Sequence, residues 1–411
     1  MSVVRTDAVR SLLMTELFLP HRGGSRVYYY HLYKGWAPDP VTVLTRKVPG
    51  WQKFDARESN EDFRIVRRLN PRNWAKLELS NSAFLLANAA KIVKRQAVDV
   101  VHSGDLFPHG VSALLLKRFF SVPYIAFSHG EDFTLTDRSR RESQMRDRIY
   151  RGADTVIANA EYSRKRLLDI GVPEERVHKL TPAVDTHEFS PAPPDAALQA
   201  RYDLVGKFVL LTVARLIPRK GHDMVIRALA NLAPKFPSVR YLIVGKGPEE
   251  SRLRKLADEL QVSKLTHFAG FIPDEQLPDY YRMSDLMVMP NREENGDIEG
   301  FGITFLEASA TGKPVIGGRS GGAGESVKEG VSGELVDGRN LGELTARIRE
   351  FIDQPAKRET MGTAGRLRAQ SEFDWKPRAE RLHAITRSLA LRYSSHSANT
   401  RVGMRGLQEL S

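Results

Sequence analysis

Two glutamates in the second half of the chain, Glu299 and Glu307, are the residues best placed by type and spacing to do chemistry. Glu299 lies on a polar loop before Gly300-Phe301-Gly302, and Glu307 follows about one turn into a predicted helix, pointing back to the same side. Two such carboxylates can accept hydrogen bonds from the hydroxyl groups of a ligand, while backbone N–H groups after Gly300 face an anion. The apolar residues between them indicate a packed segment rather than a charged surface loop, and a purely structural role of the two glutamates is the alternative.

A cationic loop follows the apolar run at 208–214. Arg215 stands at the end of that run, and Lys220 precedes a helix expected from His222. A guanidinium fork and an ammonium charge at this position can neutralise a diphosphate leaving group, with Arg219 as a spare cation. An ordinary solvated loop is the alternative explanation.

Paired glycines, Gly23 and Gly24, follow the first apolar run and precede a helical segment from Arg26. Glycines at a strand-to-helix turn let backbone N–H groups approach an anion, and the helix N-terminus adds its positive dipole end. The pair therefore predicts a phosphate cradle, with a tight turn of no further function as the alternative.

The elements that must position these residues alternate between short apolar runs and longer segments of helical period. This alternation occurs twice and is typical of parallel sheets covered by crossover helices. We therefore predict an α/β fold of two Rossmann-like doubly wound domains that face each other across a cleft. The predicted strands are 12–17, 41–45, 98–103, 123–128, 155–159 and 177–181, then 208–214, 241–245, 286–290, 314–317 and 333–336; predicted helices include 82–96, 111–120 and 161–170.

A proline-rich stretch from Ser190 to Pro194 separates the two sets of strands and indicates an interdomain linker. We predict an N-terminal domain at 1–190, a linker at 191–206 and a C-terminal domain at 207–375. A helix at 376–393 is expected to pack back toward the N-terminal domain, and the polar residues 394–411 are expected to form a flexible tail.

Composition excludes several classes of chemistry. The 411 residues include no cysteine, so disulfides, thiolate nucleophiles and cysteine-ligated metals are excluded. No membrane-spanning stretch and no secretory signal are apparent, so we expect a cytoplasmic protein. The net charge of +12 suits an anionic small molecule, an acidic membrane or nucleic acid equally, so the partner must be inferred from the site.

The segment from Glu299 to Glu307 resembles the paired-glutamate motif of the retaining glycosyltransferase family 4, whose members have the two-domain GT-B fold. The other motifs agree in order: the Gly23-Gly24 loop, a His loop at 129–132, the Arg215 and Lys220 pair, and a late Gly-rich loop at 318–325. The resemblance extends to about residue 391. One departure is Thr181-Pro182-Ala183, where relatives often have an Asn-Gly pair.

The resemblance implies a role for each matching residue. Glu307 would hold the donor ribose, Glu299 would contact the transferred sugar, and Arg215 and Lys220 would bind the diphosphate. His129 would lie beside the reacting face of the sugar. The implied donor-binding set is Gly23, Gly24, Gly300, Phe301, Gly302 and Glu307. Transfer with retention of anomeric configuration would need no covalent nucleophile, because the leaving phosphate can take the acceptor proton.

The implied ligands are a nucleotide-sugar donor and an acceptor hydroxyl on a glycan or a lipid-linked molecule. The stretch 294–302 resembles that of mannosyltransferases of the phosphatidylinositol mannoside type, so GDP-mannose is the first expected donor and a UDP-sugar the second. No cofactor, no metal and no nucleic-acid partner are expected. A metal site at Asp297 and Glu299, as in glycosyltransferases with a single domain, is the disfavoured alternative.

Two further alternatives concern the whole chain and its acceptor side. The same fold would suit a non-catalytic nucleotide-sugar-binding protein or a membrane-surface scaffold, which would bind nucleotide without turnover. The segment from Arg64 to Trp74 mixes apolar and basic residues, including Arg67, Arg68 and Arg72. It predicts either a contact with an anionic membrane that presents the acceptor or an ordinary amphipathic helix.

Overall fold

The chain forms two compact units, and each is described here by itself. The computed structural model describes residues 8–16, 18–20, 24–57, 62–68 and 77–408, with side chains up to residue 394. The first unit comprises the described parts of 1–159, 163–180 and 376–411, and the second comprises 160–162 and 181–375. The chain thus enters the second unit before the predicted linker, part of which forms the short helix α8 (Ala196–Arg201).

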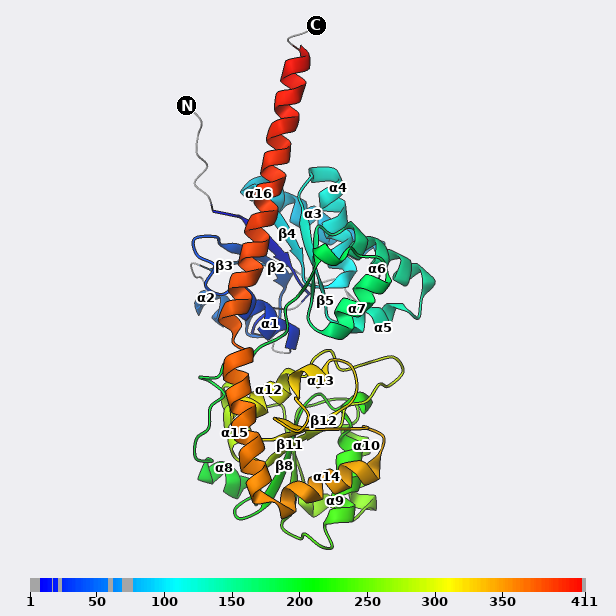
Figure 1. The fold of residues 1–411 in the computed structure, drawn as a ribbon, viewed down its shortest axis with the longest axis vertical. Coiled ribbons are helices and arrows are strands. Elements are labelled where there is room, and N and C mark those ends of the chain that lie inside the picture. Colours follow the sequence, from blue (N-terminus) through cyan, green and yellow to red (C-terminus); the bar gives the residue numbers. More distant parts are fainter. Residues whose placement is uncertain (1–7, 17, 21–23, 58–61, 69–76, 409–411) are drawn as a thin grey trace. The chain divides into compact units, whose positions relative to one another are not determined.

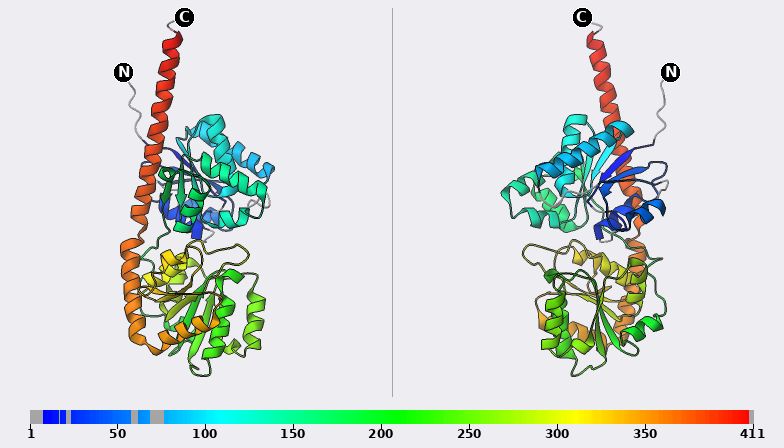
Figure 2. Two further views of the ribbon diagram at one scale, coloured as in Figure 1. Left: turned by 45° about the vertical axis from the view of Figure 1, so that its right-hand side comes forward. Right: turned by 180° about the vertical axis from the view of Figure 1, so that it is seen from behind.

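The first unit is built on a parallel sheet of seven strands. Its order is β3-β2-β1-β4-β5-β6-β7, and all neighbours pair in parallel. The strands are β1 (Ser11–Met14), β2 (Val41–Arg46), β3 (Phe63–Arg68), β4 (Val100–Ser103), β5 (Tyr124–Ser128), β6 (Thr155–Ala158) and β7 (Val177–Lys179). Helices lie on both faces of this sheet, as the doubly wound prediction required (Figures 1 and 2).

The helices of the first unit present apolar stripes to the sheet. In the helix at 79–96, Leu85, Ala89, Ile92 and Val93 recur at helical spacing and are buried in one core with strand residues. That helix ends at Ala97, whose φ of 48° lies in the left-handed region. The helices are α1 (Gly24–Tyr33), α2 (Trp51–Arg57), α3 (Leu79–Gln96), α4 (Val111–Phe120), α5 (Glu131–Thr136), α6 (Arg140–Gly152), α7 (Glu161–Asp169) and α16 (Trp375–Gln408).

The second unit repeats the arrangement with a parallel sheet of six strands in the order β10-β9-β8-β11-β12-β13. Its strands are β8 (Phe208–Val213), β9 (Val239–Val244), β10 (Thr266–Gly270), β11 (Leu286–Met289), β12 (Val315–Gly318) and β13 (Gly333–Val336). Its other helices are α9 (His222–Leu232), α10 (Glu250–Glu259), α11 (Leu277–Arg282), α12 (Ile303–Ala310), α13 (Ala323–Ser326), α14 (Leu341–Asp353) and α15 (Pro355–Glu372). The predicted fold class is therefore confirmed.

Two edge strands were not predicted from the sequence, β3 and β10. The sequence of β3 places arginines at 64, 67 and 68, and it was interpreted as a basic amphipathic segment. The helical interpretation is wrong for residues 64–68, and the remainder of the 64–74 segment lies mostly outside the described residues. Arg67 is buried, its Nη2 lies 2.7 Å from an oxygen of Asp55, and its guanidinium also donates to the carbonyl of Leu19. Arg67 is thus committed to the fold and cannot reach a membrane.

Helix α16 closes the first unit with residues from the far end of the chain. Asp39 is fully buried, and its Oδ2 accepts from His383 Nε2 at 2.6 Å and from Arg387 at 2.8 Å. The ring of His383 also stacks on Trp36, with centroids 4.7 Å apart. The helix continues to Gln408 and so includes residues 394–408, for which the sequence predicts a flexible tail.

Each sheet reverses its strand order at one place, between β1 and β4 in the first unit and between β8 and β11 in the second. The loops that leave neighbouring strands at such a place diverge to opposite faces and open a crevice, where ligands of doubly wound folds bind. The loops after β8 and β11 are the cationic loop and the Glu299 loop predicted above. The topology therefore brings both to one point.

Candidate active site

The cationic loop after β8 is short and tightly turned. Arg215 is exposed, and Pro218–Lys220 form a single turn that precedes α9. Gly221 joins this turn to the helix with φ at 75°, and a Cβ there would lie 2.4 Å from the Pro290 carbonyl. Only glycine fits both conditions, so it lets the start of α9 approach the end of β11.

The loop after β11 meets this turn through charged side chains. Glu299 accepts a hydrogen bond from Arg219 Nη1 at 2.8 Å, and the same oxygen, Oε2, accepts another from Lys220 Nζ. Arg219 Nε donates in addition to Asp297 at 2.9 Å. The side chains of Glu299 and Arg219 are each 8% exposed, and that of Lys220 is 12% exposed. One buried carboxylate therefore holds two cations of the neighbouring loop.

Burial and charge act in opposite directions on this cluster. Burial raises the pKa of Glu299, but Lys220 and Arg219 together lower it by more than burial raises it. The pKa therefore lies below its ordinary value of 4.5. Burial lowers the pKa of Lys220 below 10.5, although Glu299 works against that shift. The lowered pKa of Glu299 keeps its carboxylate ionised at neutral pH, and Lys220 is not a free cation but the partner of Glu299.

Glu307 lies on α12, as predicted, and has a partner that sequence reasoning missed. The hydroxyl of Tyr281, from α11, donates to Glu307 Oε2 at 2.6 Å. Tyr281 is fully buried, and burial together with Glu307 raises its pKa well above 10, so it stays a donor. Glu307 is thus oriented before any ligand arrives.

The Gly300-Phe301-Gly302 turn is held by the late Gly-rich loop. Gly322 N–H donates to the Glu299 carbonyl at 2.8 Å, and a Cβ on Gly322 would lie 2.2 Å from the Gly300 carbonyl. Phe301 is buried with its ring centroid 6.0 Å from that of Phe373. Gly302 starts α12 with φ at 84°. Main-chain contacts therefore fix the direction in which Glu299 leaves its loop.

In the first unit, His129 follows the end of β5. Its Nε2 lies 2.6 Å from the hydroxyl of Tyr29, and its backbone N–H donates to Asp132 Oδ1 at 2.9 Å. Asp132 also accepts from Ser128 at 2.8 Å and from the hydroxyl of Tyr150. The ring of His129 is half-buried.

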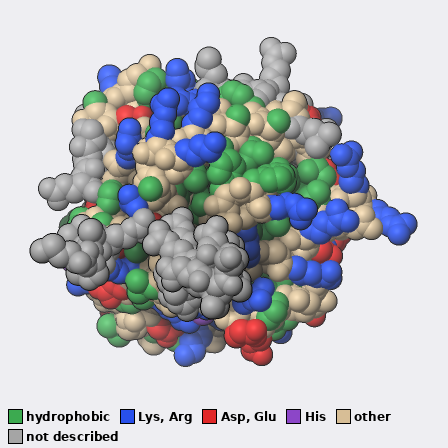
Figure 3. All heavy atoms as spheres, turned by 90° about the horizontal axis from the view of Figure 1, so that it is seen from above, with side chains coloured by type: hydrophobic (Ala, Val, Ile, Leu, Met, Phe, Trp, Pro, Cys, Tyr) green, Lys and Arg blue, Asp and Glu red, His purple; other side chains and the backbone are tan. Residues whose placement is uncertain are grey.

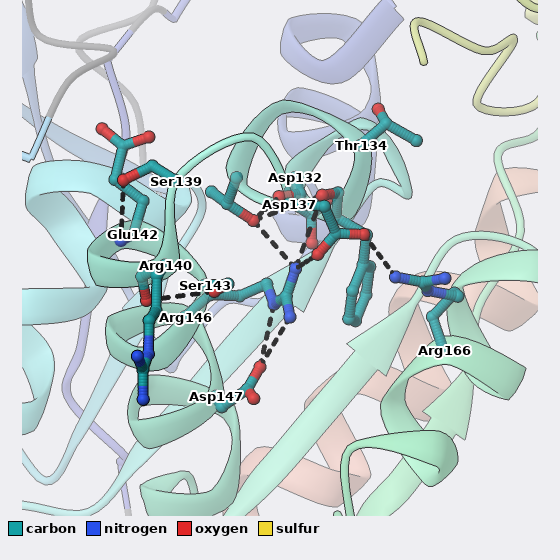
Figure 4. Close-up of polar contacts among 12 residues, drawn as sticks. Asp132, Thr134, Asp137, Ser139, Arg140, Glu142, Ser143, Arg146, Asp147 and Arg166 are labelled. Atoms are coloured by element: carbon teal, nitrogen blue, oxygen red, sulfur yellow. Dashed lines mark hydrogen bonds and ion pairs between the residues drawn. The ribbon is translucent and has the colours of Figure 1, made fainter.

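A buried arginine braces the short helix that begins after this histidine (Figure 4). The guanidinium of Arg146 reaches Asp147 at 2.8 Å, Thr136 at 2.9 Å and also Asp137, and it lies over the ring of Phe133. Arg166 donates to the second oxygen of Asp137 at 2.6 Å. The loop of His129 is thus attached to a rigid polar network.

The predicted glycine cradle is described only in part. Gly24 is the first residue of α1, as expected of a glycine at a strand-to-helix turn, while Gly23 lies outside the described residues. Near the end of β1, Asp105 accepts from Glu16 N–H at 2.7 Å and from Thr15 Oγ1 at 2.9 Å. This acid ties the loop after β1 to the loop after β4.

The predicted residues thus fall into two groups. Lys220 and Glu299 meet in the second unit with Glu307 on the following helix, whereas Gly24 and His129 belong to the first unit. The sequence predicts Arg219 to be a spare cation, yet it is the buried partner of Glu299. Its position one residue before Lys220 was visible, but no local signal showed which of the two would point inward. In the described part of the chain, no group of three or more His, Asp and Glu side chains could hold a metal ion.

Comparisons with known proteins agree with this architecture. The family model described as Glycosyltransferase Family 4 matches residues 22–188, and the one described as Glycosyl transferases group 1 matches residues 199–368. Among solved structures, the chain resembles Anabaena HepE in complex with UDP and glucose, with a TM-score of 0.77, 20% identity and coverage of 92% of this chain and 100% of that one. Sucrose-phosphate synthase from Thermosynechococcus elongatus gives 0.78 at 22% identity, covering 93% and 99%.

Curated relatives are similar over most of their length. The GDP-mannose-dependent alpha-(1-6)-phosphatidylinositol monomannoside mannosyltransferase of Mycolicibacterium smegmatis is 32% identical over 90% of this chain and 96% of its own. The D-inositol 3-phosphate glycosyltransferase of Thermobispora bispora is 30% identical over 70% of each chain. With both family models matched in order on two Rossmann-like units, the chain belongs to the family 4 glycosyltransferases of GT-B fold.

Proposed function

We propose that this glycosyltransferase moves mannose from GDP-mannose to a hydroxyl of a lipid-linked or glycan acceptor, with retention of anomeric configuration. A UDP-sugar is the second candidate donor. The proposal draws on the activity of the Mycolicibacterium smegmatis relative, a GDP-mannose-dependent mannosyltransferase that this chain matches over 96% of that relative's length. It also draws on the resemblance of the paired-glutamate segment to mannosyltransferases of this type.

The observation that carries the proposal is the cluster of Lys220, Arg219 and Glu299 between β8 and β11. It stands at the N-terminus of α9, where backbone N–H groups favour an anion. Arg215 is exposed beside it, and among the described residues we find no hydrogen bond or ion pair to its guanidinium, although its carbonyl lies 3.2 Å from His222 Nε2. Two cations and a helix terminus suit a diphosphate.

Donor binding is then an exchange of ion-pair partners. The diphosphate draws Lys220 away from Glu299, while Arg219 keeps Glu299 ionised and in place through its second contact with Asp297. The Glu299 oxygen that Lys220 leaves accepts a hydrogen bond from a hydroxyl of the transferred sugar. Because Lys220 is already partly desolvated in the fold, little reorganisation is needed as the diphosphate departs.

The transfer itself needs no protein nucleophile. The bond between the anomeric carbon and the diphosphate oxygen breaks, the acceptor oxygen bonds to that carbon on the same face, and the acceptor proton passes to the leaving phosphate. Arg215 and Lys220 stabilise the developing negative charge. Glu307 holds the ribose, and the backbone at Gly24 and at Gly300-Phe301-Gly302 contacts the donor. In this scheme the two cations take the place of a metal.

Access to a lipid-linked acceptor requires a membrane contact, and we place it at the carboxyl-terminal turns of α3 and α4. Hydrophobic side chains lie among Lys and Arg on the face shown in Figure 3. Helix α3 ends with exposed Lys91, Lys94 and Arg95 and contains no acidic residue, and Phe119 of α4 is 66% exposed. Such a mixture of exposed cations and an exposed aromatic ring suits the cytoplasmic face of an anionic membrane. None of the helices in the described residues is long and apolar enough to span a membrane.

The central test measures nucleotide release from GDP-mannose and UDP-glucose, with and without phosphatidylinositol-type acceptors. We expect release of GDP that depends on the acceptor, survives EDTA and yields an α-linked product by NMR. Binding without turnover would favour a nucleotide-sugar-binding scaffold instead. A thermal shift with UDP but not with GDP would overturn the proposed donor, since a ligand of the folded state raises its melting temperature.

The membrane contact has its own test. Sedimentation with liposomes containing anionic lipid should be reduced when Lys91, Lys94 and Arg95 become Glu. The matched control reverses three exposed cations of α10, Arg252, Arg254 and Lys255. Equal losses in both variants would show that only net charge matters and would reject a specific membrane face.

A further inference from the structure

The hydroxyl of Tyr29 lies between a carbonyl oxygen and the ring of His129. Tyr29 stands on α1 and is fully buried. Its hydroxyl donates to the carbonyl of Gly104, in the loop after β4, and lies 2.6 Å from His129 Nε2. Three elements of the first unit thus meet at one phenol oxygen.

Counting protons assigns the histidine tautomer. Tyr29 has a single proton to donate, and the Gly104 carbonyl can only accept, so that proton points to Gly104. Burial and then the Asp105 carboxylate raise the pKa of Tyr29 well above 10, which keeps it a phenol. The short contact with His129 can then be a hydrogen bond only if Nε2 carries a proton and donates to the Tyr29 oxygen. In the neutral ring, the lone pair is on Nδ1.

Nδ1 is available for a ligand. Within the described part of the first unit, we find no hydrogen bond to this atom, and the ring is half-buried rather than enclosed. The imidazole packs edge to face against the rings of Tyr28 and Tyr29, with centroids 5.9 and 5.7 Å apart, and this packing limits the rotation that would exchange its two nitrogens. The one acceptor position of the ring is therefore held in a constant direction.

We propose that Tyr29 is a positioning residue, which fixes the Nε2–H tautomer of His129 and so presents Nδ1 as a hydrogen-bond acceptor for a hydroxyl of the transferred sugar. The part that concerns the sugar rests on the proposed function, which puts His129 beside it. The part that concerns the tautomer stands on the geometry of the first unit alone.

The surroundings of Tyr29 are shaped to hold this arrangement. A Cβ at Gly104 would lie 3.0 Å from Tyr29 Cζ and 3.1 Å from Thr15 Cβ, so glycine leaves the room that the phenol needs. The Tyr29 ring also meets those of Phe127 and His129 edge to face, with centroids 5.3 and 5.7 Å apart. Packing therefore fixes the ring, and the hydroxyl adds the proton arrangement.

A second tyrosine–histidine pair provides a matched control. Tyr33 lies one turn further along α1, and its hydroxyl is 2.8 Å from His102 Nδ1. Both residues are fully buried, and burial lowers the pKa of His102 to about 3. This pair has the same chemistry on the same helix, but its histidine is enclosed and is not assigned to the site.

The direct experiment reads the tautomer by ¹⁵N NMR of the full chain labelled at histidine. The signal of His129 is assigned by its loss in His129→Gln. We expect the wild-type signal to show protonated Nε2 and unprotonated Nδ1 and to change toward a mixture in Tyr29→Phe, whose ring cannot accept. An Nδ1–H tautomer in the wild type, or an unchanged signal in Tyr29→Phe, would overturn the proposal.

Kinetics supply a second, independent reading. Tyr29→Phe should lower kcat about tenfold, the effect of losing one net hydrogen bond, with KM for the donor changed by less than about twofold. Tyr33→Phe should leave kcat near wild type, and melting temperatures report whether either variant is misfolded. Equal losses of kcat in both variants would reject a specific role for Tyr29.

The two readings separate this inference from the proposed function. If the wild-type enzyme turns over no nucleotide sugar while the NMR signals behave as expected, the proposed function fails and the assignment of the tautomer stands. If turnover is normal in Tyr29→Phe while its tautomer changes, the tautomer assignment stands but the proposed contact between Nδ1 and the sugar is rejected.

Discussion

Replacing Glu299 with Gln should destabilise the second unit far more than the same change at a comparable surface glutamate. Gln keeps the shape of the side chain but removes the negative charge that holds Arg219 and Lys220. All three side chains are at most 12% exposed, so solvent screens the lost interaction little. Breaking a buried pair in this way costs about 3–5 kcal/mol, because a buried charge loses its partner.

The lower end of that range applies here, since the amide oxygen of Gln can still accept one hydrogen bond and Asp297 still holds Arg219. For a unit of roughly 200 residues, 1 kcal/mol corresponds to about 2–4 °C in Tm. A cost of about 3 kcal/mol therefore predicts a fall of about 6–12 °C in the calorimetric transition of the second unit.

Glu294→Gln is the matched control. Glu294 lies on the same loop and pairs with Arg292 at 3.1 Å, but its side chain is 30% exposed. Ion pairs of this kind contribute about 0–1 kcal/mol, so the expected fall in Tm is at most about 4 °C. Equal shifts in the two variants would show that Glu299 does not compensate two buried cations.

Three further predictions follow from the same geometry. Because the pKa of Glu299 is lowered in the folded state, the stabilisation by its carboxylate is fully present above the ordinary value of 4.5 and is lost as pH falls through the folded value. The difference in Tm between wild type and Glu299→Gln should therefore be constant from pH 5 to 8 and shrink below about pH 4.5. A constant difference down to pH 3 would contradict this. Arg215→Ala should cut turnover at least about a hundredfold with a Tm near wild type, because the exposed Arg215 side chain is not part of the buried cluster. Lys220→Ala should reduce turnover equally and also lower Tm, because it leaves Glu299 with one cation fewer. Near-normal turnover in both variants would show that the diphosphate binds elsewhere. Gly302→Ala should lower the free energy of unfolding by more than the strain of a left-handed residue, about 1–3 kcal/mol, because its Cβ would also lie 2.6 Å from Phe305 Cδ2. The control is Gly330→Ala, where φ is 73° and a Cβ would meet nothing within 4 Å. Urea unfolding of this control measures the backbone strain alone.

The sequence predicted the central strands and the loops between them, because buried parallel strands are continuous apolar runs. It did not reveal β3, whose arginines at the sheet edge disguise the alternation, with Arg67 turned inward to Asp55. It also placed Arg215, Arg219 and Lys220 together on the loop that follows β8, where the structure has them. Which cation points inward depends on the turn Pro218–Lys220 and on a glutamate 79 or 80 residues away, and no local pattern encodes such a pairing.

The partner of Glu307 could not be predicted from the sequence for the same reason. Tyr281 lies in the short helix α11 next to a second tyrosine, Tyr280, and burial of the ring is the expected role of such a residue. Only the fold shows that its hydroxyl, rather than its ring, meets the site. The same holds for Tyr29, whose single proton orders His129.

Helix α16 has a consequence for how the protein is made. The first unit contains both the beginning of the described chain and residues from 376 onward, with the whole second unit between them. During synthesis, the hydrogen bonds of the Asp39 carboxylate cannot form until His383 and Arg387 have left the ribosome, more than 340 residues later. The second unit is contiguous apart from three residues and can fold first, which reverses the usual order from N- to C-terminus. A nascent chain halted when residue 375 has just left the ribosome should therefore carry a native second unit and a first unit still open to protease.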